Sequence, residues 1–162
     1  MHIARIFVFL YLLILIGCAS EKQKPVLSDP GFGVTAVEIQ AGAEDVEIPV
    51  YLKYDEPVKG IQFTLVWDAA KVEVSKPILL DTNPSFTVSN NEPRNGQMKV
   101  LIFSMQGNIL DVSDPEVFRL PLKLIDKEAP EVELRFENAV FAGPSASSYD
   151  IPITHAKIKI VP

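Results

Sequence analysis

The chain has 162 residues, and its 15 Lys and Arg against 21 Asp and Glu give a formal net charge of −6. Neutralising phosphates supplies most of the affinity for nucleic acid, so a chain this acidic is a poor candidate for a nucleic-acid-binding protein. A single cysteine excludes an intramolecular disulfide and a thiolate metal cluster. The length suits one ordinary domain with a core of its own.

The first residues have the pattern of an export signal. Arg5 precedes an apolar run from Ile6 to Gly17, which is too short for the roughly 20 helical residues that cross a bilayer. A basic start followed by about 7–15 apolar residues is typical of a secretory signal peptide. The run ends in Leu15-Ile16-Gly17-Cys18, which resembles the lipobox of bacterial lipoproteins. An ordinary signal peptide with a chance cysteine is the alternative.

The lipobox resemblance implies that residues 1–17 are a lipoprotein signal peptide and that Cys18 becomes an acylated N-terminus. Several acyl chains, at about 0.8 kcal/mol per buried CH₂, would anchor the protein to a membrane that it does not span. We therefore expect a lipid-anchored protein of the bacterial cell envelope. Ala19 favours the outer membrane in cells that have one. Residues 18–33 are polar and contain Pro and Gly, which predicts a lipidated flexible tether.

From residue 34 to the C-terminus the apolar residues alternate with a period of two, which predicts β-strands. The alternation is clear in 46–54, 61–68, 118–124, 131–137 and 155–160, and weaker in 34–40, 71–75, 85–89 and 138–142. The segment 98–105 is apolar in both phases, so we expect it to be central in a sheet or covered on both faces. Turn clusters of Asp, Asn, Pro and Gly separate the runs. The pattern predicts an all-β sandwich of about nine strands over residues 34–162.

Two residue types allow finer predictions within these strands. Pro49 and Pro121 lie inside strand runs and lack the backbone donor of the ladder, so each strand should have an edge or a bulge there. Trp67, the only tryptophan, is in phase with Phe63 and Leu65. We therefore expect Trp67 in the core.

Several segments resemble the cohesin domain family. Residues 60–74 are similar to the family's third and fourth strands, with Trp67-Asp68-Ala69 at an aromatic-Asp-Pro turn where Ala69 replaces the proline. Residues 42–50 resemble a strand that ends in Pro-Val, and residues 136–142 resemble the segment before the last strand. The resemblance covers roughly 34–161. It implies a nine-stranded sandwich of jelly-roll topology that binds dockerin modules on other proteins.

The residues themselves give little support for catalysis. His155 is the only histidine after the signal peptide, whereas a nucleophile triad or a metal site needs convergent partners. Three glutamates alternate within 131–137 and could act as acid and base on a sugar, but their spacing is typical of a solvated strand. Residues 81–83 and 111–114 offer oxygen ligands without matching a calcium loop. We predict a non-catalytic protein with no cofactor and no metal.

Carbohydrate binding by a module of the same fold, linked to polysaccharide breakdown, is the alternative function. A sugar platform needs exposed aromatic rings. Tyr51 lies on the polar phase of its strand and Tyr149 lies in a Ser-rich loop. Two separated tyrosines make a weak platform, so binding of a dockerin-like or other extracytoplasmic protein is the preferred reading, with polysaccharide as a further possible ligand.

The resemblance also implies where the partner binds. Cohesins bind across one sheet, through outward residues of the strand that matches 60–67 and of the strand that matches 98–105. A small central cluster of such a face carries most of the binding energy. We expect the protein to be a monomer. The partner-binding residues that the resemblance implies are Gln62, Thr64 and Val66 on the first strand, and Gln106, Gly107 and Asn108 after the second.

Overall fold

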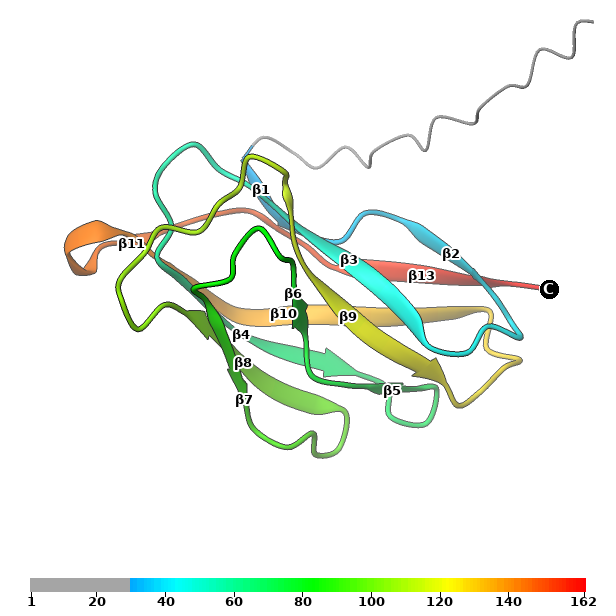
Figure 1. The fold of residues 1–162 in the computed structure, drawn as a ribbon. Helices are drawn as coiled ribbons and strands as arrows, with labels where there is room; N and C mark the ends of the chain where they lie inside the picture. The colour runs from blue at the N-terminus through cyan, green and yellow to red at the C-terminus, as the bar shows by residue number, and fades with distance from the viewer. Residues whose placement is uncertain (1–29) are drawn as a thin grey trace, which may run out of the picture.

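The computed structural model describes residues 30–162, which form a sandwich of two β-sheets (Figure 1). The predicted signal peptide 1–17, Cys18 and the tether up to residue 29 lie outside the described residues. Among residues 30–162, no helix is long and apolar enough to cross a bilayer. The two packed sheets confirm the predicted β-sandwich.

Each sheet combines strands that are distant in the sequence, and we name the sheets A and B. Sheet A has the order β12 (Ile153–Thr154), β1 (Gly31–Gly33), β3 (Val46–Lys53), β9 (Glu116–Leu124) and β5 (Val72–Val74), and β6 (Ile78–Leu79) also pairs with β9. Sheet B has the order β2 (Val37–Gln40), β13 (Ala156–Val161), β10 (Glu131–Ala142), β4 (Gly60–Trp67), β8 (Gln97–Phe103) and β7 (Thr87–Asn90). The two-residue strand β11 (Ser148–Tyr149) pairs with β10 beyond the single 3₁₀ turn at Pro144–Ala146.

The structure has more strands than the nine that the periodicity predicts. The additional strands β1, β6, β11 and β12 are only two or three residues long, so they are too short to show an alternation. Conversely, the two strands predicted at 131–137 and 138–142 form one strand, β10, with a bulge between Glu137 and Val140. The extra residue reverses the phase, so that Phe136 before the bulge and Phe141 after it are both buried.

The core between the sheets centres on five phenylalanine rings. Phe32 lies at its middle, with ring centroids 5.8 Å from Phe63, 5.2 Å from Phe136 and 5.1 Å from Phe141. Phe118 of β9 stacks on Phe63 with an interplanar angle of 10°. The rings come from both sheets and join them by direct contact. Trp67 is 8% exposed at the end of this core, which confirms its predicted burial.

The boundary that the sequence predicts between tether and domain is three residues too late. Residues 31–33, assigned to the tether, form β1, which pairs antiparallel with β3 and parallel with β12. Its neighbour Thr154 leaves no room for a side chain at Gly33, where a Cβ would lie 1.9 Å from the Thr154 carbonyl oxygen. The Pro-Gly composition of this segment is typical of a loop, but here the glycine allows close strand contact.

Pro49 and Pro121 both lie where their strand has an unpaired edge, one of the two arrangements predicted for them. Pro121 of β9 falls between the residues that pair with β5 and those that pair with β6. Pro49 of β3 lies beyond the residues 51–53 that pair with β1, and close to the bulge that Val117 forms in the partner strand β9. Each proline thus lies where its strand is paired on one side only, and the unpaired side is one to which no backbone N–H has to donate.

Candidate binding face

The outward surface of β10, β4, β8 and β7 in sheet B carries the predicted binding residues, and we call it the outer B face. Along β4 the even residues Gln62, Thr64 and Val66 are half-buried, while the odd residues are buried in the core. Their outward phase is therefore confirmed. Register places each between two neighbours: Leu101 and Val140 beside Gln62, Lys99 and Glu137 beside Thr64, and Gln97 and Arg135 beside Val66.

One half of the outer B face is apolar. Leu101 of β8 is 38% exposed and Val140 of β10 is 45% exposed, and both flank Gln62. Val140 faces outward only because of the bulge in β10, which the sequence pattern did not predict. At the next position Gly60 lies between Phe103 and Ala142, and a Cβ there would come 3.1 Å from the Ile102 carbonyl oxygen. The missing side chain keeps this end of the face flat.

The predicted loop residues Gln106, Gly107 and Asn108 lie shortly after the apolar end of β8, beyond Ser104 and Met105. The backbone N–H of Gly107 donates to the Ser104 carbonyl at 3.1 Å, and Gly107 has a φ of +70°, which a glycine adopts readily. The Asn108 amide donates to the Gln106 side-chain oxygen at 3.4 Å. These bonds hold a compact turn that displays its polar side chains.

Two apolar residues of the same loop were missed by the sequence reasoning. Met105 is 84% exposed and Ile109 is 55% exposed. Leu110 then donates its backbone N–H to the Val58 carbonyl at 2.7 Å, which fixes the loop beside the start of β4. Exposed apolar residues gathered at one place mark interaction sites more often than scattered ones do. Their grouping depends on tertiary contacts, so the period-two pattern contains no signal for it.

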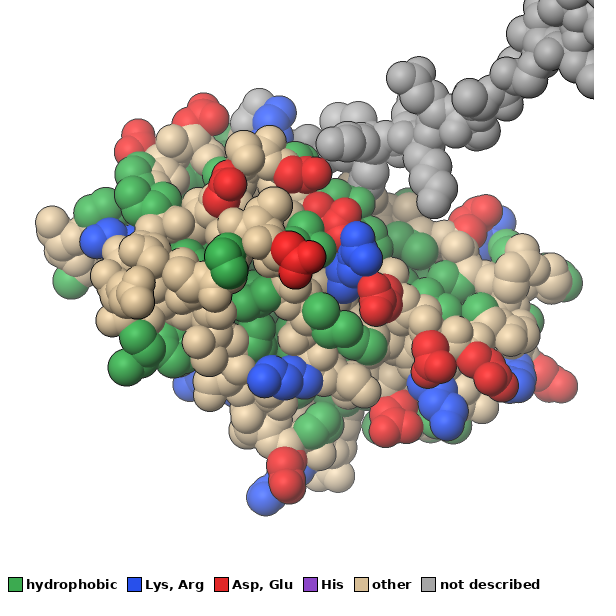
Figure 2. Space-filling model, in the orientation of Figure 1, with side chains coloured by type: hydrophobic (Ala, Val, Ile, Leu, Met, Phe, Trp, Pro, Cys, Tyr) green, Lys and Arg blue, Asp and Glu red, His purple; other side chains and the backbone are tan. Residues whose placement is uncertain are grey.

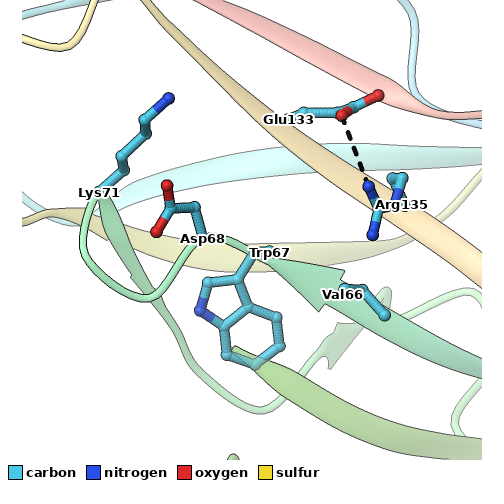
Figure 3. Close-up of a pocket in the computed structure, with 6 residues that line it drawn as sticks. All are labelled: Val66, Trp67, Asp68, Lys71, Glu133 and Arg135. Atoms are coloured by element: carbon cyan, nitrogen blue, oxygen red, sulfur yellow. Dashed lines mark ion pairs between the residues drawn. The ribbon is translucent and has the colours of Figure 1, made fainter. Parts of the chain in front are cut away.

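The opposite half of the outer B face is charged. A shallow hollow of about 320 Å³ is lined by Val66, Trp67, Asp68, Lys71, Glu133 and Arg135 (Figure 3). Arg135 lies 4.0 Å from Glu133 and 3.2 Å from Glu137 on the same strand. In Figure 3 the Glu133–Arg135 pair projects from β10, while Asp68 and Lys71 stand on the turn that follows β4.

A second hollow, on the β8 side of Thr64, is lined by cations and by no carboxylate, unlike the first. It is lined by Thr64, Asn91, Arg94, Gln97 and Lys99. The backbone N–H of Lys99 donates to the Asn91 side-chain oxygen at 2.6 Å, and Asn91 donates its backbone N–H to the Lys99 carbonyl at 3.3 Å. These bonds hold the residues after β7 against β8. The lining thus combines two cations with amide and hydroxyl groups.

Three of the residues considered for catalysis or metal binding, His155, Asn83 and Asp111, make hydrogen bonds that join segments of the fold. His155 accepts the backbone N–H of Phe136 at its Nδ1 atom, 3.2 Å away, just beyond the β10–β13 ladder. Asn83 is buried and joins the two acidic loops, because its side-chain oxygen accepts the Asp111 N–H at 2.7 Å and its amide donates to the Asp111 carbonyl at 3.1 Å. Asp111 in turn accepts the Ser113 N–H, which lowers the pKa of that carboxyl.

Among residues 30–162 no three His, Cys, Asp or Glu side chains are grouped as metal ligands. On the side of the molecule that Figure 2 displays, basic and acidic side chains are interspersed. Such a surface does not offer the single-signed basic patch that phosphate binding uses.

The tyrosines do not form a flat platform for a sugar. Tyr51 alternates with the core residues Val50 and Leu52, as its predicted polar phase requires, but it is nevertheless buried. Burial, with Glu116 and Asp114 nearby, raises the pKa of Tyr51. Tyr149 contacts Tyr54 with ring centroids 4.9 Å apart, but the two rings are tilted by 54°. The Tyr149 hydroxyl donates to the Pro57 carbonyl at 3.3 Å.

Solved structures of other proteins resemble this sandwich. It resembles the cohesin module of a family 33 glycoside hydrolase from Clostridium perfringens, with 17% identity, a TM-score of 0.62, and coverage of 82% of this chain and 95% of that one. It also resembles a non-cellulosomal cohesin from the archaeon Archaeoglobus fulgidus, with 16% identity, a TM-score of 0.64, and coverage of 83% and 93%.

A third similar structure is a Clostridium thermocellum type I cohesin–dockerin complex, with 20% identity, a TM-score of 0.63, and coverage of 85% of this chain and 97% of that one. These likenesses establish a cohesin-like β-sandwich fold. No match was found among curated proteins. The family model for the cohesin domain matches residues 31–160, which span the whole sandwich from β1 to β13. The chain therefore belongs to the cohesin domain family.

Proposed function

We propose that this chain is a non-catalytic lipoprotein whose cohesin domain captures a dockerin-type partner on the outer B face. The observation that carries the proposal is the row of Gln62, Thr64 and Val66 at the middle of that face, between an apolar and a charged half. Type I cohesins of similar fold have been solved in complex with dockerins. Membership of the family supports the same kind of partner for this chain.

The backbone of the outer B face favours recognition through side chains. β4 is paired with β10 on one side and β8 on the other, and β8 is paired with β4 and β7. A partner strand therefore cannot add to either of them, because their backbone groups are already used. A partner that contacts β4 and β8 must instead lie flat across the face, as expected for an interface with a small central cluster of energetically important contacts.

The proposed anchor is compatible with this face. Cys18, once acylated, would hold the chain at a membrane of the bacterial cell envelope, the outer membrane in cells that have one. The tether joins the domain at β1, which belongs to sheet A, whereas the partner would bind sheet B. In Figure 1, β1 lies on the far side of the molecule from β7 and β8. A monomer anchored in this way keeps the binding residues accessible.

The experiment is a binding screen of the full chain against a panel of purified dockerin modules by biolayer interferometry. Replacing Thr64 and Val66 by arginine should abolish binding by any module that the unmodified chain captures, while thermal stability stays nearly unchanged, because both side chains face outward. Ile78 and Ile125, exposed on β6 and after β9, provide a matched control when both are changed to arginine. If the Thr64 and Val66 double variant still binds the module while the Ile78 and Ile125 control does not, the interface lies elsewhere.

Polysaccharide binding, the second function considered, receives no specific support from residues 30–162. The tilted pair of Tyr54 and Tyr149 is partly buried against the core, whereas a sugar-binding platform needs exposed ring faces. An affinity for soluble glycans that disappears in Tyr54→Ala, with dockerin binding unaffected, would favour this alternative.

A further inference from the structure

The two halves of the outer B face differ in chemistry, and the difference restricts what the partner presents. Leu101 and Val140 make one half apolar, and Lys99 and Arg94 lie beside the other half on β8 and the preceding turn. We infer that the dockerin-type partner places an apolar side chain over Leu101 and Val140, and an acidic side chain over the hollow at Arg94 and Lys99. This inference rests on the proposed function and adds the chemistry of the partner.

Charge is the first argument for an acidic partner residue. The hollow beside Thr64 is lined by two cations, two amides and a hydroxyl, with no carboxylate in its lining. Within the described residues, neither Arg94 nor Lys99 belongs to an ion pair, although the chain as a whole has an excess of acidic residues. Two unpaired cations at the edge of a flat contact surface favour a partner of opposite charge and disfavour a basic one.

The neighbouring glutamates do not cancel this preference. Glu133 and Glu137 on β10 both lie against Arg135, at 4.0 and 3.2 Å. Glu137 is on the other side of Thr64 from Lys99, because β4 lies between β10 and β8. The two glutamates on the β10 side therefore already contact a cation, whereas no ion pair within residues 30–162 includes Arg94 or Lys99.

Strand geometry fixes the distance between the two expected contacts. Leu101, Lys99 and Gln97 point outward from β8 at alternate positions. With a rise of about 3.3 Å per residue, the carboxylate would lie roughly 7–13 Å from the apolar contact, along the direction of β8. The hydroxyl of Thr64 and the side-chain amides of Asn91 and Gln97 line the same hollow. They would supply hydrogen bonds to a carboxylate that the cations attract.

A charge-reversal exchange tests the inference. A yeast-display library of dockerin modules that differ in surface charge is first sorted for modules that bind the full chain. Changing both Arg94 and Lys99 to glutamate should then weaken a selected binder at least tenfold, and changing the responsible Asp or Glu of that binder to lysine should restore its affinity for the altered chain. The control changes Lys76 and Lys123, both exposed near sheet A, to glutamate, which alters the net charge equally.

The outcomes separate the two proposals. If binders are selected but the reversal at Arg94 and Lys99 weakens them no more than the control does, the acidic contact is wrong and dockerin capture stands. If binding is lost but no single lysine substitution in the binder restores it, the carboxylate contact is also wrong. If no dockerin module binds, the proposed function fails and this inference fails with it.

Discussion

Replacing Phe32 by alanine measures how much the three-residue strand β1 contributes to the fold. The Phe32 side chain is fully buried, and four phenylalanine rings lie within 6.2 Å of its centroid. Removing a buried phenylalanine costs about 3–5 kcal/mol in all, and a ring with four aromatic neighbours belongs near the upper end of this range, because each of these contacts is favourable. We therefore expect a loss of about 4–5 kcal/mol, a large part of the 5–15 kcal/mol typical of a domain.

Urea denaturation followed by tryptophan fluorescence measures this loss, because Trp67 is buried in the folded domain. With a denaturant dependence of about 2 kcal/mol per M, the unfolding midpoint should fall by about 2 M. Phe103→Ala is the matched control, since this half-buried ring lies on the outer B face, and it should cost only about 1 kcal/mol.

A second comparison separates the ring from the strand. A chain that begins at Val34 lacks β1 entirely and should be at least as unstable as Phe32→Ala. Equal unfolding midpoints for chains that begin at residues 30 and 34, together with a Phe32→Ala loss below 1 kcal/mol, would contradict this reasoning and return residues 31–33 to the tether.

Three further changes test other parts of the structure. Asn83→Ala leaves the Asp111 N–H without its buried acceptor, so the free energy of unfolding should fall by about 1–3 kcal/mol; an unchanged urea midpoint would show that water replaces the amide. Gly96→Ala should destabilise the domain in thermal melts, because φ is +72° and the new Cβ would lie 2.1 Å from the Trp67 carbonyl oxygen. Cys18→Ala should abolish incorporation of a fatty-acid probe in cells, and persistent labelling would contradict lipidation at this residue.

Phase along a strand could be predicted from the sequence, whereas the positions where the phase changes could not. The alternation of Phe63, Leu65 and Trp67 correctly placed these residues inward, and therefore placed Gln62, Thr64 and Val66 outward. In β10 the same reasoning stopped at the bulge, since one extra residue moves every later side chain to the opposite face. The outward position of Val140 was missed for this reason.

The pairing of strands was also beyond the sequence pattern. β1 and β12 are held in sheet A by a parallel pairing between residues 32–33 and 153–154, more than a hundred positions apart in the chain. Neither segment is long enough to show alternation. In the same way the apolar and cationic parts of the outer B face come together only because β10, β4 and β8 are adjacent. The cohesin resemblance placed the face on β4 and β8, but the division of that face into two halves required the structure.

The arrangement of Phe32 has a mechanical consequence. If the chain is held at Cys18 and a partner pulls on the outer B face, the tension runs from one sheet to the other. It enters at β1, where Phe32 contacts Phe63 of β4 and Phe136 of β10 at centroid distances of 5.8 and 5.2 Å. Those two strands carry Thr64, Val66 and Arg135 on their opposite side. Under such a pull, the packed rings would carry load across the thickness of the domain, in addition to the backbone that links β1 of sheet A to β2 of sheet B.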